Sequence, residues 1–193
     1  MPPSLCIELS ASEQNRLLDI ARRSISSGLT AGRALQLDLA QLEDSLQIKA
    51  AVFITLTQAG ELRGCVGSLQ ALEPLAQAVA TSAFNAAFRD RRFPALSADE
   101  LDAIRIEISV LSEMEPIEAP TRQALLDSLQ PGVDGVLLED RGQRATFLPK
   151  VWEKITSPTE FLEQLLHKAG LGTGHWSDSL RFQRYHTFTF AEN

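Results

Sequence analysis

The sequence predicts an α+β fold of two lobes, in which each lobe is a mainly antiparallel sheet covered by helices. Two hairpin patterns, over about 50–68 and 134–148, are each followed by an amphipathic helix and then by a strand. A connector that contains Pro and Glu, from Glu113 to Pro120, separates the two patterns. The halves share this order of elements without a matching sequence repeat, and 193 residues suffice for one substantial core or two small lobes.

The order of these patterns predicts three segments of the chain. We expect the first lobe at about 48–112 and the second at about 120–193. Residues 1–47 are expected to form an N-terminal helix and a connection that pack on the lobes.

The elements of the first half follow from local patterns. Ser10 and Glu13 have the spacing of a capping box, and helical periodicity after them predicts a helix from about Ser12 to Ser27. The segment 29–47 reads as an extended connection with a turn of helix. The remaining predicted elements are hairpin strands over 50–57 and 61–68, an amphipathic helix opening at Pro74, and a half-buried strand over 104–110.

Local patterns also predict the elements of the second half. Ser157 is a capping residue, Pro158 occupies the first helical position, and Gly170 is placed to end the helix. The other predicted elements are a short helix from Thr121 to Leu129, hairpin strands over 134–139 and 143–148, and one last strand from Leu180 to Phe190.

Composition narrows the class of protein. Hydrophobic residues make up 44% of the chain and charged residues 22%, which is typical of an ordered globule. The formal net charge of −7 argues against nucleic-acid binding, despite arginines at positions 89, 91 and 92. The sequence has no apolar run of the roughly 20 residues that span a bilayer, and Met1 to Ser4 lack the start of a signal peptide. Two distant cysteines, Cys6 and Cys65, suit a reducing compartment, so we expect a cytoplasmic protein without a membrane partner.

The candidate site is the stretch 61–68, because it places a thiol and a guanidinium between glycines on a predicted strand. A period of two puts Arg63, Cys65 and Gly67 on one face. A nearby positive charge stabilises a thiolate, which would make Cys65 reactive. Glycine inside a strand often marks the close approach of a ligand or a backbone. The candidate ligand-binding residues are Gly64, Gly67, Ser68 and Arg92.

Each candidate also has a structural interpretation. Cys65 could be a nucleophile, a redox thiol or a ligand, or simply a small buried hydrophobe. Arg63 could hold an anion, or it could pair with Glu107, which lies among strand isoleucines. The arginines around Asp90 could bind an anion or form a solvated face. The candidate catalytic residues are Cys65, Arg63 and Glu107.

The sequence offers no pattern for a metal or a cofactor. The three histidines, His167, His175 and His186, lack close ligand spacing, and neither cysteine belongs to a Cys-x-x-Cys pair. The sequence contains no Gly-x-Ser-x-Gly elbow and no phosphate-binding glycine loop. We therefore name no metal and no cofactor.

Five blocks in one order carry a resemblance to a known family. They are residues 62–69 (Leu-Arg-Gly-Cys-Val-Gly-Ser-Leu), 92–96 (Arg-Phe-Pro-Ala-Leu), 106–111 (Ile-Glu-Ile-Ser-Val-Leu), 134–138 (Asp-Gly-Val-Leu-Leu) and 146–152 (Thr-Phe-Leu-Pro-Lys-Val-Trp). With these blocks the chain resembles the AMMECR family, also called AmmeMemoRadiSam system protein A, from about Leu9 to Tyr185. The resemblance implies an α+β fold of two subdomains and an association with Memo-type and radical-SAM proteins, without an assigned reaction. The sequence departs from the family pattern at Arg91, where we expect proline.

The sequence is compatible with two functions and does not decide whether the chain is an enzyme. The first is a small cytoplasmic enzyme, or enzyme component, that acts on a small molecule in a pocket around Arg63, Cys65 and Glu107. The alternative is a non-catalytic module that presents the same surface to a metabolite or a protein.

Overall fold

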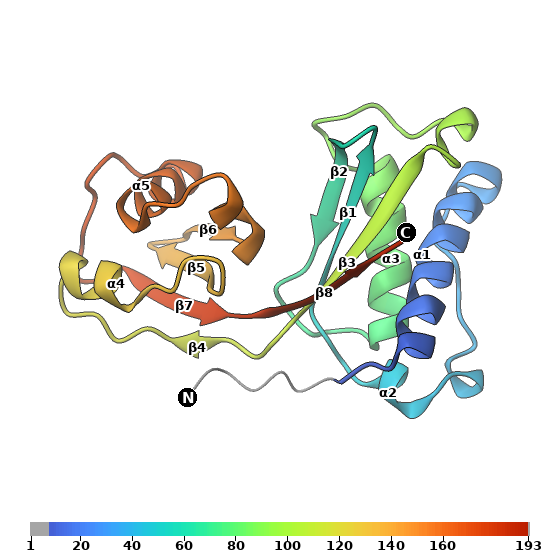
Figure 1. Cartoon of the computed structure of the whole chain (residues 1–193), viewed down its shortest axis with the longest axis horizontal. Helices are drawn as coiled ribbons and strands as arrows, with labels where there is room; N and C mark the ends of the chain where they lie inside the picture. Colours follow the sequence, from blue (N-terminus) through green and yellow to red (C-terminus); the bar gives the residue numbers. More distant parts are fainter. Residues whose placement is uncertain (1–7, 193) are drawn as a thin grey trace. The chain divides into compact units, whose positions relative to one another are not determined.

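The computed structural model describes residues 8–192 and contains two units, each built around its own four-stranded sheet (Figure 1). The first unit comprises residues 8–111 and 188–192, and the second comprises residues 112–187. The strand order is β2-β1-β3-β8 in the first sheet and β4-β7-β5-β6 in the second. The predicted α+β fold with antiparallel sheets is confirmed. The expectations that concern Met1 to Ser4 and Cys6 lie outside the described residues.

The bounds of the elements are as follows. The first sheet and its helices are α1 (Ala11–Ala31), α2 (Asp44–Gln47), β1 (Val52–Gln58), β2 (Glu61–Gly67), α3 (Leu75–Phe88), β3 (Ile104–Leu111) and β8 (Thr187–Ala191), with 3-10 turns η1 (Leu39–Gln41) and η2 (Ala98–Glu100). The second sheet and its helices are β4 (Glu115–Pro116), α4 (Arg122–Ser128), β5 (Gly135–Asp140), β6 (Gln143–Phe147), η3 (Pro149–Glu153), α5 (Pro158–Lys168) and β7 (Arg181–Tyr185).

Helix α1 begins where the sequence predicts and ends later. The side chain of Ser10 accepts a hydrogen bond from the Glu13 amide, and the Glu13 carboxylate accepts one from the Ser10 amide, so the capping box is confirmed. The helix continues past Gly28, and this glycine is explained by packing against the ring of Phe88, where a Cβ would lie 2.1 Å from a ring carbon. It ends at Gly32, whose φ of 67° is left-handed.

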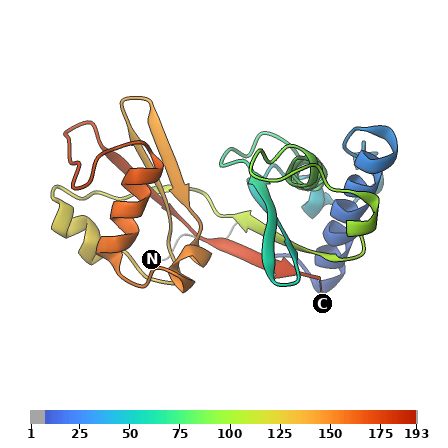
Figure 2. The same ribbon diagram turned by 90° about the horizontal axis from the view of Figure 1, so that it is seen from above.

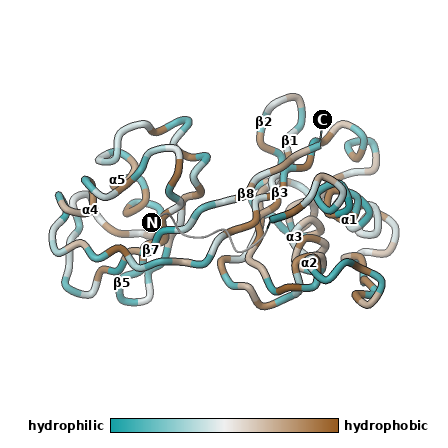
Figure 3. The backbone as a smooth tube through the Cα atoms, turned by 60° about the horizontal axis from the view of Figure 1, so that its bottom comes forward, coloured by the Kyte–Doolittle hydropathy of each residue, from teal (hydrophilic) through white to brown (hydrophobic). Residues whose placement is uncertain are grey.

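Helices α1 and α3 cover one face of the first sheet (Figure 2). The inward side chains of β1 and β3 alternate with outward ones, and Ile54, Leu56, Ile106 and Ile108 are fully buried. Helix α3 is coloured on the hydrophobic side of the scale along much of its length (Figure 3), and its alanines allow close packing on the strands. Among the described residues, no helix has the length and apolar character to cross a membrane.

The second unit packs α4 and α5 on its sheet around a separate core. The rings of Trp152 and Phe161 stack with centroids 3.8 Å apart. Helix α5 has Ser157 as its N-cap and Pro158 in its first turn, and Gly170 after it has a φ of 77°, as the sequence predicts.

The predicted single strand from Leu180 to Phe190 is wrong. Strand β7 belongs to the second sheet and β8 to the first, and the strands part at His186. Aromatic residues occur on both sides of His186, at Phe182, Tyr185, Phe188 and Phe190, so the sequence resembles one strand and does not show that the chain changes sheets. Residues 188–192 therefore belong to the first unit, whereas the sequence predicts them in the second lobe. Residues 8–47 also belong to the first unit.

Hydrogen bonds from α1 and β3 attach the C-terminal end of the described chain to the first sheet. Arg22 of α1 donates two hydrogen bonds to the Glu192 carboxylate, at 2.7 and 2.6 Å. The same carboxylate accepts a bond from the Ile106 amide at 2.9 Å. These contacts hold the strand order in which β8 lies beside β3.

Candidate functional site

The position of Cys65 depends on a β-bulge in β2. Next to the turn, Thr57 pairs with Leu62, but Leu56 pairs with Gly64, so Arg63 is an extra residue in the strand. The bulge shifts the register by one, which places Cys65 opposite Thr55. Because Thr55 alternates with buried residues that face the helices, Cys65 lies on the opposite face of the sheet.

The backbone of Cys65 is held by two side chains that follow α3. The Cys65 amide donates to Asp90 Oδ2 at 2.9 Å, and Arg92 Nη2 donates to the Cys65 carbonyl at 3.2 Å. Arg92 also donates to both oxygens of Asp90, at 2.9 and 2.6 Å. An ion pair therefore occupies the outer edge of β2 at Cys65, where an adjoining strand would otherwise bond. We call Asp90 and Arg92 the edge clamp.

The edge clamp is held firmly in its charged state. Only 6% of the Asp90 side chain is exposed. The bonds from Arg92, supported by that from the Cys65 amide, lower the pKa of Asp90 to about 2. The clamp reaches β2 because the chain turns back after α3, with the Leu96 amide bonded to the Ala87 carbonyl at 2.9 Å.

Cys65, Thr55 and Glu107 lie in one row across three strands. Thr55 pairs with Cys65 on one side and with Glu107 on the other. Residues that are directly opposite in antiparallel strands point to the same face, so the three side chains share the face away from the helices. Thr55 Oγ1 donates to Cys65 Sγ at 3.5 Å. Cys65 is half-buried and is a free thiol.

Arg63 does not pair with Glu107, and that hypothesis is wrong. Its Nε and Nη2 donate to the two carboxylate oxygens of Glu100, at 2.7 and 3.0 Å, and Nη1 has no hydrogen-bond partner among the described residues. The pair with Arg63 lowers the pKa of Glu100 to about 2 and raises the pKa of Arg63. The bulge explains the change of partner, since it interrupts the alternation that would set Arg63 on the face of Cys65. Glu107 lies on the strand beyond Thr55, in the same row as Cys65.

Backbone packing explains why glycine occupies positions 64 and 67, the two glycines among the candidate ligand-binding residues. A Cβ at Gly64 would lie 2.3 Å from the Ala86 carbonyl oxygen of α3. A Cβ at Gly67 would lie 2.2 Å from the Val52 carbonyl oxygen. Both glycines therefore mark close approach of a backbone. Ser68 forms a local turn, in which its hydroxyl accepts from the Gln70 amide at 3.0 Å.

Arginine side chains after α3 and in β2 lie over two phenylalanine rings. Arg92 lies over the ring of Phe93 at 5.5 Å, and Arg63 lies over the same ring at 6.0 Å. Arg89 lies over the ring of Phe84 at 5.1 Å. Arg92 is the member of the cluster that reaches Cys65, and its charge is matched by Asp90.

The sequence reading missed three residues of the site. Thr55 lies within an apolar run, and its signal is the register of the hairpin once the bulge is included. Asp90 is an acid among arginines, which the sequence reading treats as part of an anion-binding corner. Glu100 belongs to a 3-10 turn with its own capping box, so its spacing from Ser97 gave no sign of Arg63. Their roles depend on contacts between distant segments.

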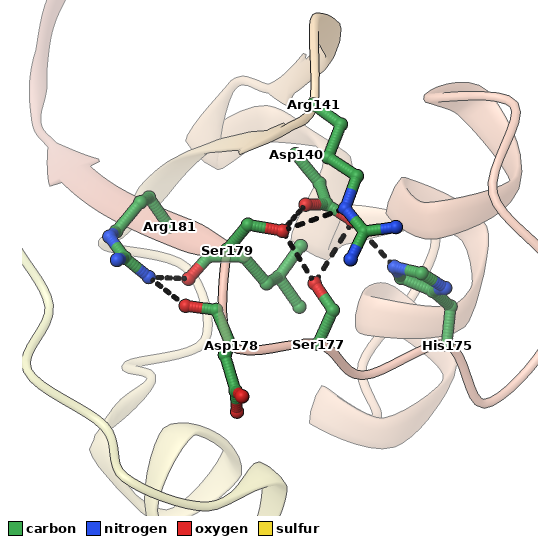
Figure 4. A network of polar contacts seen from close by, with 8 residues as sticks. Asp140, Arg141, His175, Ser177, Asp178, Ser179 and Arg181 are labelled. Carbon is green, nitrogen blue, oxygen red and sulfur yellow. Dashed lines mark hydrogen bonds and ion pairs between the residues drawn. The ribbon is translucent and has the colours of Figure 1, made fainter.

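A second polar cluster lies in the second unit (Figure 4). Asp140 at the end of β5 accepts bonds from Ser179 at 2.5 Å and Ser177 at 3.1 Å, and its carboxylate lies 2.6 Å from His175 Nε2. These bonds, that of Ser179 above all, lower the pKa of Asp140. In a Ser-His-Asp triad the histidine stands between the acid and the serine, whereas here both serines bond the acid. The cluster fastens the connection 171–180 to the hairpin of β5 and β6.

Metal ligation has little support in the described part of the chain. No group of three or more His, Cys, Asp or Glu side chains lies together among residues 8–192 in a way that could hold an ion. The chemistry that the first unit offers is that of a half-buried thiol bonded to a hydroxyl on the next strand, with a carboxylate on the strand beyond it.

Comparisons with known proteins cover almost the whole chain. A protein-family model described as AMMECR1 matches residues 18–190. A protein of Methanothermobacter thermautotrophicus is 35% identical over 191 residues, which span 96% of this chain and 97% of that protein. A protein of Thermofilum pendens is 33% identical and spans 95% of this chain and 92% of its own length. The crystal structure of the uncharacterised protein PH0010 from Pyrococcus horikoshii superposes with a TM-score of 0.86 at 29% identity, over 92% of this chain and 90% of that chain.

Proposed function

This chain belongs to the AMMECR1 family, and we propose that it is an enzyme, or an enzyme component, that acts on a small molecule through the thiol of Cys65. The observation that carries the proposal is the row Cys65, Thr55 and Glu107 on one face of the first sheet. A cysteine nucleophile needs a neighbour that stabilises the thiolate and a group that accepts its proton. The row offers a hydroxyl donor and a carboxylate in those positions.

The edge clamp supports the same proposal. It bonds both the amide and the carbonyl of Cys65, so the backbone that carries the thiol is fixed on both sides. A nucleophile acts efficiently when the surrounding residues hold it in one geometry. In this proposal Cys65 is the catalytic residue, Glu107 accepts its proton, and Asp90 and Arg92 are positioning residues.

Arg63 takes a supporting role in this proposal. The sequence alone allows Arg63 to hold an anionic group, but the residue is only 8% exposed and its guanidinium is paired with Glu100. We assign it instead to holding the bulge against the segment that contains Glu100. Substrate anions, if bound, would meet Arg92, whose side chain is 55% exposed.

The second candidate function is a non-catalytic module that binds a metabolite or a protein with the same surface. The observation that favours it is the exposed side chain of Arg92 beside Cys65, which is free to meet a ligand on its outer side, whereas Gly64 and Gly67 are explained by packing. In that case Cys65 would be a small side chain in a structural row. Memo-type and radical-SAM proteins remain proposed partners, supported only by the resemblance of the sequence blocks, and a cytoplasmic location stays a proposal.

Alkylation kinetics test the enzyme proposal. A Cys6→Ser background leaves Cys65 as the single thiol of the chain. We expect iodoacetamide to modify Cys65 at pH 7 faster than it modifies N-acetylcysteine, as followed by intact-protein mass spectrometry. A rate no faster than that of the free thiol would remove the nucleophile from the proposal.

Metabolite capture separates the two candidate functions. Wild type, Cys65→Ala and Arg92→Ala would be incubated with a cell extract and their bound small molecules compared by mass spectrometry. The enzyme proposal expects a covalent or turned-over species that disappears in Cys65→Ala. A metabolite that Cys65→Ala retains unchanged and Arg92→Ala loses would instead support the binding module.

A further inference from the structure

A hydroxyl on the neighbouring strand contacts the sulfur of Cys65. Thr55 Oγ1 donates to Cys65 Sγ at 3.5 Å, which is within range for a hydrogen bond to sulfur. A hydrogen bond donated to the charged form of an acid favours that form, and this hydroxyl is placed to donate to the sulfur of Cys65. Thr55 is therefore placed to control when Cys65 is a nucleophile.

The next residue in the row can accept a proton from Thr55. Thr55 pairs directly with Glu107 on β3. Side chains that are directly opposite in an antiparallel sheet have Cβ atoms about 4.5 to 5.5 Å apart, a separation that a glutamate can span toward a hydroxyl. The hydroxyl therefore lies between the thiol and the carboxylate in the row.

We infer that Thr55 passes the proton of the Cys65 thiol to Glu107. The inference rests on the proposed function of Cys65 and deepens it. In this step the thiol proton moves to Thr55 Oγ1 while the hydroxyl's own proton moves to the Glu107 carboxylate. The products are a thiolate, a neutral hydroxyl that donates to it, and a neutral carboxyl, so charge and atoms balance. The hydroxyl then donates to the sulfur, in the direction of the observed bond.

The other charged groups around Cys65 do not replace this relay. Glu107 faces the row from β3, and the edge clamp of Asp90 and Arg92 faces it from the segment after α3. The clamp bonds the backbone of Cys65, the Arg92 guanidinium also interacts with the Cys65 side chain, and the two charges of the clamp match each other. A change at Thr55 should therefore alter the pH dependence of the thiol while the clamp stays in place.

The test measures how the alkylation rate of Cys65 depends on pH in Thr55→Val, Thr55→Ser, Thr57→Val, Glu107→Gln and the double variant of Thr55→Val with Glu107→Gln. The parent of all five is the Cys6→Ser protein. Thr55→Val removes the hydroxyl and keeps the branched shape that suits a strand. Thr55→Ser keeps the hydroxyl. The matched control is Thr57→Val, on the same face of β1 but opposite Leu62 and Arg105.

We expect Thr55→Val to react about tenfold more slowly at pH 7, as for the loss of one hydrogen bond to a charged group, with its rate curve displaced to higher pH. Thr55→Ser should recover most of the rate, and Thr57→Val should follow the parent curve. Glu107→Gln should slow the reaction alone but add little to Thr55→Val, because the two residues act in one relay.

The outcomes separate this inference from the proposed function. If Cys65 outpaces N-acetylcysteine but Thr55→Val keeps the parent pH curve, the relay is wrong and the nucleophile stands. If Thr55→Ser is as slow as Thr55→Val, or if Thr55→Val and Glu107→Gln slow the reaction additively, the relay is also overturned. If Cys65 in the parent reacts no faster than the free thiol, the proposed function fails and this inference fails with it. Thermal unfolding of each variant shows that the rates compare folded proteins.

Discussion

Arg63 and Glu100 form a two-bond ion pair that joins the bulge of β2 to the turn before β3, with N to O distances of 2.7 and 3.0 Å. The side chains are 10% and 20% exposed. Pairing an arginine with a carboxylate through two parallel bonds fixes geometry as well as charge. The pair therefore holds the extra residue of the bulge, and with it the register that places Cys65 opposite Thr55.

The first prediction concerns this pair. Glu100→Gln leaves the largely buried guanidinium of Arg63 without a counter-charge, so we expect the free energy of unfolding to fall by about 3 kcal/mol. Urea denaturation followed by circular dichroism measures the change. Asp99→Asn is the control, because Asp99 is the exposed neighbour of Glu100. Equal stability of the two variants would contradict the structural role of the pair.

The second prediction concerns acid pH. Asp90 has a pKa of about 2 in the folded chain, below its ordinary value of 3.8. A carboxyl whose pKa is lowered by folding adds stability above its unfolded pKa and loses that contribution as the pH falls through the folded value. We expect the parent to lose free energy of unfolding between about pH 4 and about pH 2. Asp90→Asn should be less stable at neutral pH and should lose less over this range, while Asp99→Asn should follow the parent. Urea denaturation at a series of pH values measures both slopes, and parallel slopes for Asp90→Asn and the parent would contradict this role of Asp90.

The third prediction concerns the contact between β2 and α3. Gly64→Ala would bring a methyl group to 2.3 Å from the Ala86 carbonyl oxygen, and a backbone oxygen cannot rotate away. We expect a loss of about 1 to 3 kcal/mol in the free energy of unfolding, as for overpacked cores. Gly172→Ala is the matched control, since a Cβ there meets nothing within 4 Å. A Gly64→Ala protein as stable as Gly172→Ala would show that the helix and the strand are further apart.

The fourth prediction concerns the cluster of Figure 4. Asp140→Ala removes the carboxylate that both Ser177 and Ser179 bond, so the connection 171–180 should open more often. Hydrogen exchange with mass spectrometry should show faster exchange in this segment, while helix α3 stays protected. Asp178→Asn, at an exposed position of the same connection, should exchange like the parent. Unchanged protection in Asp140→Ala would show that other contacts hold the segment.

Local patterns in the sequence were sufficient for most elements of the fold. The capping box of Ser10 and Glu13, the proline that opens α5 and the two hairpins are signals within a few residues of each other, and the structure confirms them. The family resemblance also follows from short blocks, and the comparisons support it. Such signals are local because propensity, capping and alternation depend on neighbouring residues.

The arrangement of the candidate site was decided by the tertiary structure. Without the bulge at Arg63, the register of the turn would have set Cys65 opposite Ile54, on the face that α1 and α3 cover. A bulge arises from the fit of one strand to its neighbours, and a strict period of two cannot reveal it. For the same reason the sequence could not show that Arg63 would pair with Glu100, which is 37 residues away. The identity of the candidate thiol was a local property of the chain, whereas its neighbours Thr55, Asp90 and Glu107 were brought to it only by folding.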